Sequence, residues 1–428
     1  MTMDRRNVIK RIGGAGVAAT LAGCSVQESG DGGSGDGSSG DGGDGSSGDG
    51  SSGTEQEPAG TATAWYSLSE SELATRKEII SAFNEESRHT IDGADISDLQ
   101  QKTSSAIPAG EGPQTFDWAH DWAGNTFEQG FIVDQSDKVS VELSQFTEAA
   151  QTAVQYDGNL IGLPYAAETV TPIANMDIVD SAPSSVSEMV SMMEEHHDPD
   201  NGQYGLAYPI NSYFTSAWLQ AFGGYFFELG GDPELGVAQD EFIRGLEFLM
   251  ENLRPYMPND PGYSPQAATF QEGNAAFTIN GPWSLTAMDD NDINYQVLPF
   301  PSMESGQPTP YTGIQTWYFA KPMGTEGPAA KAARSFIEWF VTNDDHLRTL
   351  AQEQGSIPVK KSILEEGDLP DVVSAFGASA EQGRPMPAAP RMGDVWGPVD
   401  SALVKVFNGD ASAEQALTTA AEQIRSNW

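Results

Sequence analysis

Cysteine and basic residues are both scarce in this chain. Cys24 is the only cysteine among 428 residues, which excludes an internal disulfide and a thiolate metal site. Lysine and arginine number 21 against 62 aspartates and glutamates, so the net charge is -41 at pH 7. A surface of this charge repels nucleic acid and anionic lipid, and neither is expected as a partner.

The acidic excess belongs to the folded part of the chain. Residues 1–60 carry 9 acidic and 4 basic side chains, which leaves a net charge of about -36 on the rest. Acid-rich, lysine-poor surfaces are typical of proteins from extreme halophiles, where high salt screens the repulsion. Calcium binding is a rival explanation, but no Asp-x-Asp-x-Asp-Gly loop with a glutamate at position twelve occurs.

Signatures of catalysis and of cofactor or metal binding are also missing. No Ser-His-Asp or Gly-x-Ser-x-Gly arrangement stands out, and no glycine-rich phosphate loop follows a strand. The five histidines lack metal-ligand spacing, and the adjacent pair His196 and His197 would diverge on a helix. We therefore expect no metal and no cofactor.

The N-terminus has the features of an export signal. Residues 4–10 resemble a twin-arginine motif, and the apolar run from Ile12 to Ala22 is too short to span a membrane. The run ends in Leu-Ala-Gly-Cys, which resembles a lipobox, so Cys24 is expected to carry a lipid anchor. Residues 1–24 are assigned to a lipoprotein signal.

Residues 25–60 consist largely of glycine, serine and aspartate. They cannot bury a core, so a disordered, self-repelling tether is expected. The sequence thus predicts a domain that is exported by the twin-arginine route and tethered through its lipid to the extracellular face of the cell membrane.

Strands and helices alternate through the remaining chain, which predicts an α/β fold. A strand at 63–67 is followed by Ser69-Glu70-Ser71-Glu72, a capping box that begins a helix. Apolar stripes predict further helices, one of them behind a Ser412 cap. The stripes are Phe242, Leu246, Leu249, Met250 and Leu253; Ala332, Ala333, Phe336, Ile337 and Phe340; and Leu417, Ala421 and Ile424.

The stretch from Ala275 to Trp283 carries the strongest indication of a site. Strand-like residues meet Gly-Pro, which predicts a sharp turn that delivers Trp283 at the carboxyl end of a sheet, where ligands bind in open α/β folds. A lone Trp is more often a packing residue. Three more aromatic stretches, 116–122, 213–215 and 392–396, also stand at element edges and favour binding.

Aromatic rings beside carboxylates suit carbohydrate. The C–H face of a pyranose matches the negative face of an aromatic ring, and the hydroxyls need acceptors such as Asp121 and Glu168. The same carboxylates could nominally serve a glycoside hydrolase, but no repeated strand–helix barrel units accompany them. Binding without catalysis is the favoured interpretation.

From about Trp65 to the C-terminus the sequence resembles the maltose/maltodextrin-binding proteins of ABC sugar importers. The most specific pieces are residues 118–121 (Trp-Ala-His-Asp), 278–283 and 213–215. The resemblance implies a type II periplasmic-binding-protein fold, with two α/β lobes joined by a hinge that the chain crosses three times. It also implies a monomer that captures a maltose-like oligosaccharide in the cleft and delivers it to an ABC permease.

The resemblance further implies lobe boundaries and site residues. The N-terminal lobe would hold residues 61–167 plus 317–366 and the C-terminal lobe 168–316 plus 371–428. Residues 159–168 would form the first hinge strand. The second crossing would fall near residues 311–316 and the third near residues 366–371. Sugar-stacking residues would be Trp118, Tyr213, Trp283 and Trp396, hydrogen-bonding residues Asp121 and Glu168, and additional cleft residues Trp65, Trp122, Phe214 and Met386.

The polar positions depart from the family pattern. Trp122 stands where the family's best-known member has a basic residue, and Gln100 and Gln101 stand where an acidic pair is expected. An α-glucan of different length, linkage or end is therefore implied. Another sugar or polyol, such as trehalose, or a glycerol phosphate stays open as an alternative ligand.

Overall fold

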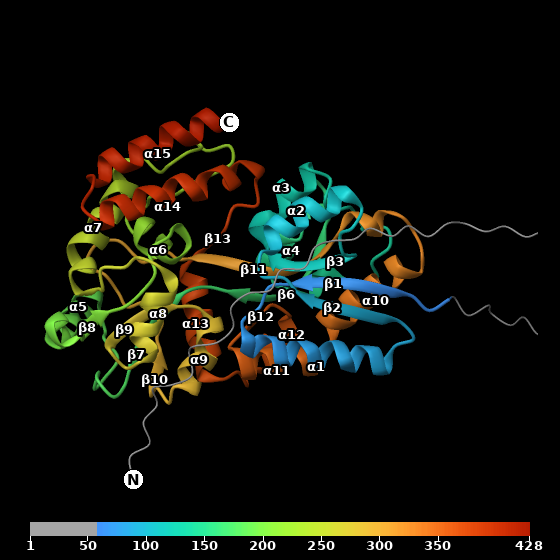
Figure 1. Cartoon of the computed structure of the whole chain (residues 1–428), viewed down its shortest axis with the longest axis horizontal. Coiled ribbons are helices and arrows are strands. Elements are labelled where there is room, and N and C mark those ends of the chain that lie inside the picture. The colour runs from blue at the N-terminus through green and yellow to red at the C-terminus, as the bar shows by residue number, and fades with distance from the viewer. Residues whose placement is uncertain (1–57) are drawn as a thin grey trace, which may run out of the picture. The chain divides into compact units, whose positions relative to one another are not determined.

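The computed structural model describes residues 58–428, and two β-sheets flanked by helices organise them (Figure 1). The expected lipoprotein signal, Cys24 and nearly all of the expected tether lie outside the described residues. Within residues 58–428, no helix is long and apolar enough to cross a membrane.

The first sheet is mixed and contains the N-terminal strands. Its order is β12 (Ile357–Pro358), β6 (Gly162–Glu168), β11 (Tyr311–Phe319), β3 (Thr115–Ala119), β1 (Thr61–Tyr66) and β2 (Thr90–Asp95), with β13 (Arg384–Pro385) paired to β11. Strand β1 runs parallel to β2 and β3, whereas β11 is antiparallel to β3 and β6. Strands β1, β3 and β6 therefore end at the same edge.

The second sheet has four strands, in the order β10 (Tyr295–Val297), β7 (Thr171–Asn175), β9 (Ala275–Asn280) and β8 (Tyr204–Leu206). Strand β7 follows β6 after two residues, and β11 is the strand that follows β10 in the chain. The chain thus passes between the sheets at β6–β7 and again at β10–β11. A separate hairpin joins β4 (Gln155–Tyr156) to β5 (Asn159–Leu160).

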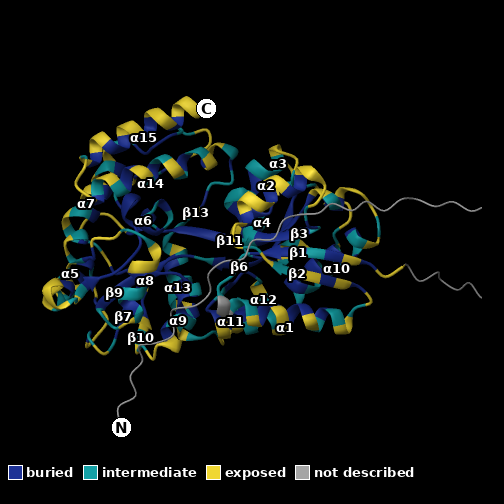
Figure 2. Cartoon of the chain, in the orientation of Figure 1, coloured by how far each residue is buried: buried dark blue, intermediate teal, exposed yellow. Residues whose placement is uncertain are grey.

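Helices bury their apolar faces against these sheets and against one another. The helices that follow the strands of the first sheet are α1 (Glu70–Glu86), α2 (Leu99–Ala109), α3 (Ala123–Glu128), α4 (Glu148–Ala153), α10 (Pro328–Thr342), α11 (Asp344–Gln354) and α12 (Lys361–Glu366). The others are α5 (Val186–His196), α6 (Ser212–Leu219), α7 (Asp240–Asn252), α8 (Tyr263–Gln271), α9 (Leu285–Asp290), α13 (Asp371–Gln382), α14 (Gly393–Phe407) and α15 (Ala413–Asn427). Figure 2 shows buried strands inside and exposed residues on the outer helix faces.

Several local predictions are confirmed. The capping box is present at the start of α1, where the backbone N–H of Ser69 donates to Glu72 at 2.9 Å. The Ser412 side chain caps α15 by accepting a hydrogen bond from Gln415 N. Strand β9 ends at Asn280, immediately before the predicted Gly-Pro turn. The three predicted apolar stripes lie on α7, α10 and α15, and most of their residues are buried.

Candidate functional site

A cavity of about 750 Å³ opens where strands of both sheets end. The first sheet contributes the turn after β1, the segment from Asp117 to Trp122 at the end of β3, and Glu168 at the end of β6. After β9 comes the 3₁₀ turn Pro282–Ser284, which carries Trp283, and α6 and α14 contribute further side chains. The cavity therefore lies at the carboxyl ends of strands, the position expected for a ligand site in an α/β fold.

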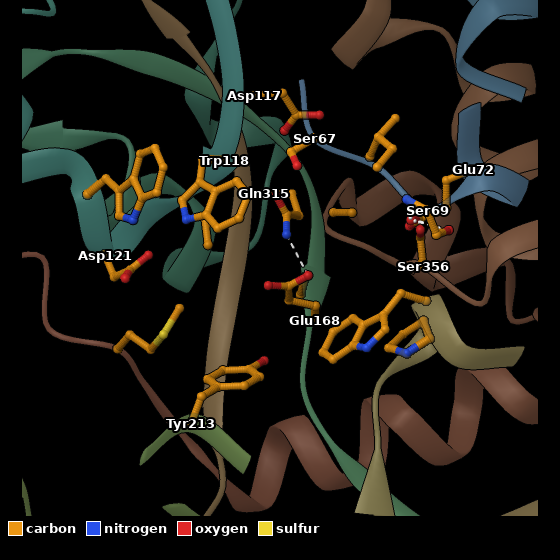
Figure 3. Close-up of a pocket in the computed structure, with 18 of the residues that line it drawn as sticks. Ser67, Ser69, Glu72, Asp117, Trp118, Asp121, Glu168, Tyr213, Gln315 and Ser356 are labelled. Carbon is orange, nitrogen blue, oxygen red and sulfur yellow. Dashed lines mark hydrogen bonds between the residues drawn. The ribbon is translucent and has the colours of Figure 1, made fainter. Parts of the chain in front are cut away.

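Aromatic and polar side chains both surround the cavity. Figure 3 shows Trp118 and Asp121 on one side of the space, Ser69, Glu72 and Ser356 on the opposite side, and Glu168 with Gln315 between them. Carboxylate groups therefore lie on both sides of the space and at its centre. A ligand that fills the cavity meets apolar faces and hydrogen-bonding groups at once.

Nine of the ten cleft residues expected from the sequence line this cavity. They are Trp118, Asp121, Trp122, Glu168, Tyr213, Phe214, Trp283, Met386 and Trp396. The indoles of Trp118 and Trp122 stack at 4.5 Å with an interplanar angle of 25°. On the other sheet's side, the ring of Tyr213 lies 6.4 Å from that of Trp283. The site thus presents two separate aromatic groups.

Trp65 is the exception, because it does not line the cavity. It is 8% exposed and belongs to a core cluster with Leu99, Ile107 and Phe116. Side chains alternate along a strand, so a residue near the end of β1 can point either into the cavity or into the core. Trp65 points into the core, and the expectation of a cleft role for it does not hold.

Asp121 and Glu168 are half-buried carboxylates in the cavity wall. Burial raises the pKa of Asp121 to about 7, because an ion is poorly solvated there. Burial likewise raises the pKa of Glu168 to about 7, against a hydrogen bond from Gln315 that lowers it. Asp121 Oδ1 is shut off from solvent and has no hydrogen-bond partner among residues 58–428. Such an unpaired acceptor is suited to a ligand hydroxyl.

Tyr213 presents a second unpaired polar group. Its hydroxyl is buried and has no hydrogen-bond partner within the described part of the chain. The residue lies in the first turn of α6, whose N-cap Asn211 accepts a hydrogen bond from Phe214 N at 3.0 Å. The sequence placed 213–215 at the edge of an element, and α6 begins at Ser212, so this stretch forms the first turn of the helix. Tyr213 can therefore both stack against a ligand and bond to it.

A buried ion pair supports one wall of the cavity. Arg76 of α1 donates to Asp117 of β3 at 2.6 Å, and both side chains are 3% exposed. The Tyr165 hydroxyl donates to Asp117 at 2.9 Å and accepts from Arg76 at 3.2 Å. Burial alone would lower the pKa of Arg76, but Asp117 and Tyr165 together outweigh burial and the pKa is raised. Sequence reasoning missed this group, whose members lie 41 and 48 residues from Asp117.

His120 joins three distant segments behind the cavity. Its Nδ1 accepts the backbone N–H of Ile314 at 3.0 Å, so Nε2 carries the proton and donates to the Met386 carbonyl at 2.8 Å. Burial lowers the pKa of His120 to about 4, and the ring is neutral at pH 7. These two bonds hold β3, β11 and the Met386 segment together.

Sequence reasoning also missed polar residues at several points of the wall. Asp400 on α14 accepts the backbone N–H of Ser212 at 2.7 Å and thereby occupies the start of α6. Glu72 was recognised for its capping box and not for its position in the wall. Further unpredicted lining residues are Ser67, Asn211, Tyr263, Gln315, Gln354 and Ser356. No short motif marks them, because remote segments bring them together.

Comparison with solved structures defines the class of protein. A cyclo/maltodextrin-binding protein in complex with maltotetraose is similar to this chain with a TM-score of 0.72 and 26% identity. The match covers 87% of this chain and 98% of that protein. Two helix-flanked sheets with a cavity at their strand ends therefore define a periplasmic-binding-protein-like fold, as the sequence predicted.

The chain belongs to the bacterial extracellular solute-binding protein family, whose model matches residues 78–376. The maltotriose-binding protein of Pyrococcus abyssi is 36% identical over 86% of this chain and 83% of its own length. The galactooligosaccharide-binding protein of Bacillus subtilis is 28% identical over 74% and 77%. A maltooligosaccharide ABC transporter solute-binding lipoprotein of Streptococcus pneumoniae is 23% identical over 82% and 85%. These proteins bind solutes and are not enzymes, so the hydrolase alternative is set aside.

Proposed function

We propose that the chain captures a malto-oligosaccharide in the cavity at the strand ends. The observation that carries this proposal is the convergence of two aromatic groups, one around Trp118 and one around Trp283, on a space that also holds unpaired carboxylate and phenol oxygens. Glucosyl rings would stack on the indoles while their hydroxyls donate to Asp121 and Glu168. Similarity to a maltotriose-binding protein supports an α-glucan as the ligand.

Binding is coupled to movement of two lobes in this proposal. The lobes would comprise 61–167 plus 317–366 and 168–316 plus 371–428, with the hinge at the passages between the sheets. Trp118 would stack from the first lobe, and Tyr213, Trp283 and Trp396 from the second. Only a closed arrangement lets both sets contact one sugar, so the ligand would favour closure. The closed form would be recognised by an ABC permease, as similarity to a transporter lipoprotein supports.

The N-terminal features extend the proposal to the cell surface. The twin-arginine motif would export the folded chain, Cys24 would carry the lipid, and residues 25–60 would tether a monomeric receptor outside the cell membrane. The net charge of -41 supports a role at high salt, where screening reduces repulsion among surface carboxylates. This composition is the reason that we propose a halophilic source.

The charges around the cavity favour a neutral ligand over glycerol phosphate. Arg76 is the only basic side chain in the lining, and Asp117 already neutralises it. The acidic lining residues are Glu72, Asp117, Asp121, Glu168 and Asp400. A phosphate would face these carboxylates without a free cationic partner, which disfavours anionic solutes.

A calorimetric titration of the purified full-length chain in high salt tests the proposal. The ligands are maltotriose, maltotetraose, trehalose, a galactooligosaccharide and glycerol phosphate. We expect saturable binding of the α-glucans together with a rise in melting temperature, because a ligand stabilises the state that it binds. Binding of the galactooligosaccharide or trehalose alone would keep the receptor role and reject the α-glucan assignment.

A further inference from the structure

Gln315 is the only residue of β11 that is not buried, and its side chain lines the cavity. Strand β11 pairs with β3 on one side and β6 on the other, so it occupies the interior of the first sheet. A half-exposed amide in such a strand is unexpected, because the other positions of β11 are filled by core residues. The feature therefore points to a role at the cavity.

The pairing register brings Gln315 to Glu168. Glu168 lies directly opposite Gly313, and Gln315 is two residues further along β11 on the same face. Gly313 leaves the space that Glu168 occupies, since a Cβ there would lie 2.9 Å from both Cγ and Oε1 of Glu168. The carboxylate thus extends over Gly313 and reaches the Gln315 amide.

One hydrogen bond fixes the carboxylate. The Nε2 of Gln315 donates to Oε2 of Glu168, and because a carboxylate only accepts, the amide must present its NH₂ group. No other side-chain bond involves Glu168 within residues 58–428, so Oε1 keeps its full capacity to accept. Figure 3 shows this bond at the centre of the space, with Asp121 and Tyr213 across from it.

We propose that Gln315 is a positioning residue for ligand binding, which holds Oε2 of Glu168 so that Oε1 faces the sugar hydroxyls. The proposal rests on the proposed function and assigns a role to a residue that the sequence motifs do not mark. Because Glu168 ends β6 and Gln315 lies on β11, the acceptor is held by the two strands that lead to the passages between the sheets.

Several charged groups surround this pair and set its titration. Burial raises the pKa of Glu168, the neighbouring carboxyl groups of Glu72, Asp121 and Asp117 add to this effect, and the hydrogen bond from Gln315 opposes it. Arg76 lines the same cavity but is engaged by Asp117, and the Tyr213 phenol is neutral because burial raises its pKa. Loss of the Gln315 amide therefore removes a hydrogen bond that lowers the pKa of Glu168, so that a larger fraction of Glu168 is protonated near pH 7.

The test compares Gln315→Leu with the wild type in the full-length chain. A hydrogen bond to a charged group is worth enough to move a pKa by about one unit. Carbon-13 NMR of glutamate-labelled protein, with the Glu168 carboxyl assigned by Glu168→Gln, should show its pKa raised by about one unit. Maltotriose affinity, measured from pH 9 down to 5.5, should weaken as Glu168 becomes protonated. In Gln315→Leu this weakening should begin about one pH unit higher than in wild type.

Controls separate positioning from a structural effect. Gln100→Leu removes another amide from the cavity lining and should leave the Glu168 titration unchanged. In a Glu168→Gln background, Gln315→Leu should no longer shift the pH profile of binding. An unchanged Glu168 pKa in Gln315→Leu, or an equal shift in the Glu168→Gln background, overturns the proposal. The NMR titration needs no sugar, so failure of wild type to bind maltotriose would reject the function without affecting this result.

Discussion

Replacement of Trp283 by alanine tests whether the aromatic groups bind sugar. A glucosyl ring laid on an indole buries about 100 Å² of apolar surface on the two partners, and at about 25 cal/mol per Å² this contributes about 2.5 kcal/mol. Trp283→Ala should therefore raise the Kd for maltotriose about 70-fold. Isothermal titration calorimetry in high salt measures this without relying on tryptophan fluorescence.

The fold should tolerate this substitution. Trp283 is half-buried, and the centroid of its ring lies 6.4 Å from that of Tyr213 and 6.1 Å from that of Phe214. Each aromatic contact is worth about 1 kcal/mol, so the loss is about 2 kcal/mol. For a chain of this size that lowers the melting temperature by about 3 °C. The two free-energy costs are similar, but the binding cost changes the Kd about 70-fold whereas the folding cost leaves the chain folded well below its melting temperature.

Trp428 provides a matched control. It is also half-buried and packs against Phe227 at 5.6 Å and beneath Arg391, but it does not line the cavity. Trp428→Ala should lower the melting temperature by a similar amount and leave the Kd unchanged. Wild-type affinity in folded Trp283→Ala, or equal weakening in both variants, would refute the stacking role.

Three further predictions concern the ion pair, the cavity carboxylate and the anchor. Asp117→Asn leaves the buried Arg76 charge uncompensated and should cost about 3–5 kcal/mol in urea unfolding, whereas Glu326→Gln at an exposed pair should cost under about 1 kcal/mol. The pKa of Asp121 is raised to about 7, so the folded, unliganded protein loses stability as pH rises from about 4 to 7 and this carboxyl group must ionise. Asp121→Asn carries no ionisable group there. The melting temperature of the variant should therefore rise relative to wild type over this pH range and remain higher above about pH 7. Cys24→Ser should move the protein from the membrane fraction to the medium in cell fractionation.

Each of these predictions has a contrary result. Equal unfolding costs for Asp117→Asn and Glu326→Gln would show that the buried pair carries no special weight. A melting-temperature difference for Asp121→Asn that does not change with pH would mean that Asp121 is ionised throughout. Membrane retention of Cys24→Ser would place the anchor elsewhere.

Local structure was predictable where neighbouring residues determine it. The capping box at Ser69 and Glu72 and the turn after β9 involve residues within a few positions of each other, and both are present. The aromatic residues of the cavity were also found, because each stands at the end of an element. Trp65 also stands near the end of a strand, yet the alternation of side chains along β1 directs it into the core. Only the pairing of β1 with β2 and β3 shows which face of β1 meets the core and which meets the cavity.

The polar part of the cavity was not predictable in the same way. The Gln315 amide meets Glu168 across 147 residues, and Arg76 meets Asp117 across 41. Such pairs depend on the register of β6, β11 and β3, which no short motif encodes. One signal was available in the sequence: Gln315 interrupts a strongly strand-like run from Tyr311 to Phe319, where a polar side chain requires a partner.

The two bonds of His120 make one wall of the cavity depend on a single ring proton. The neutral ring can accept from Ile314 and donate to Met386 at the same time, whereas a protonated ring can only donate. Asparagine or glutamine offers both a donor and an acceptor, but on a shorter or more flexible group that cannot reproduce the span of an imidazole. Acid strong enough to protonate His120 would therefore break its bond with Ile314 of β11 while the bond to Met386 persists, and it would loosen the cavity wall from behind only after Asp121 and Glu168 have been protonated.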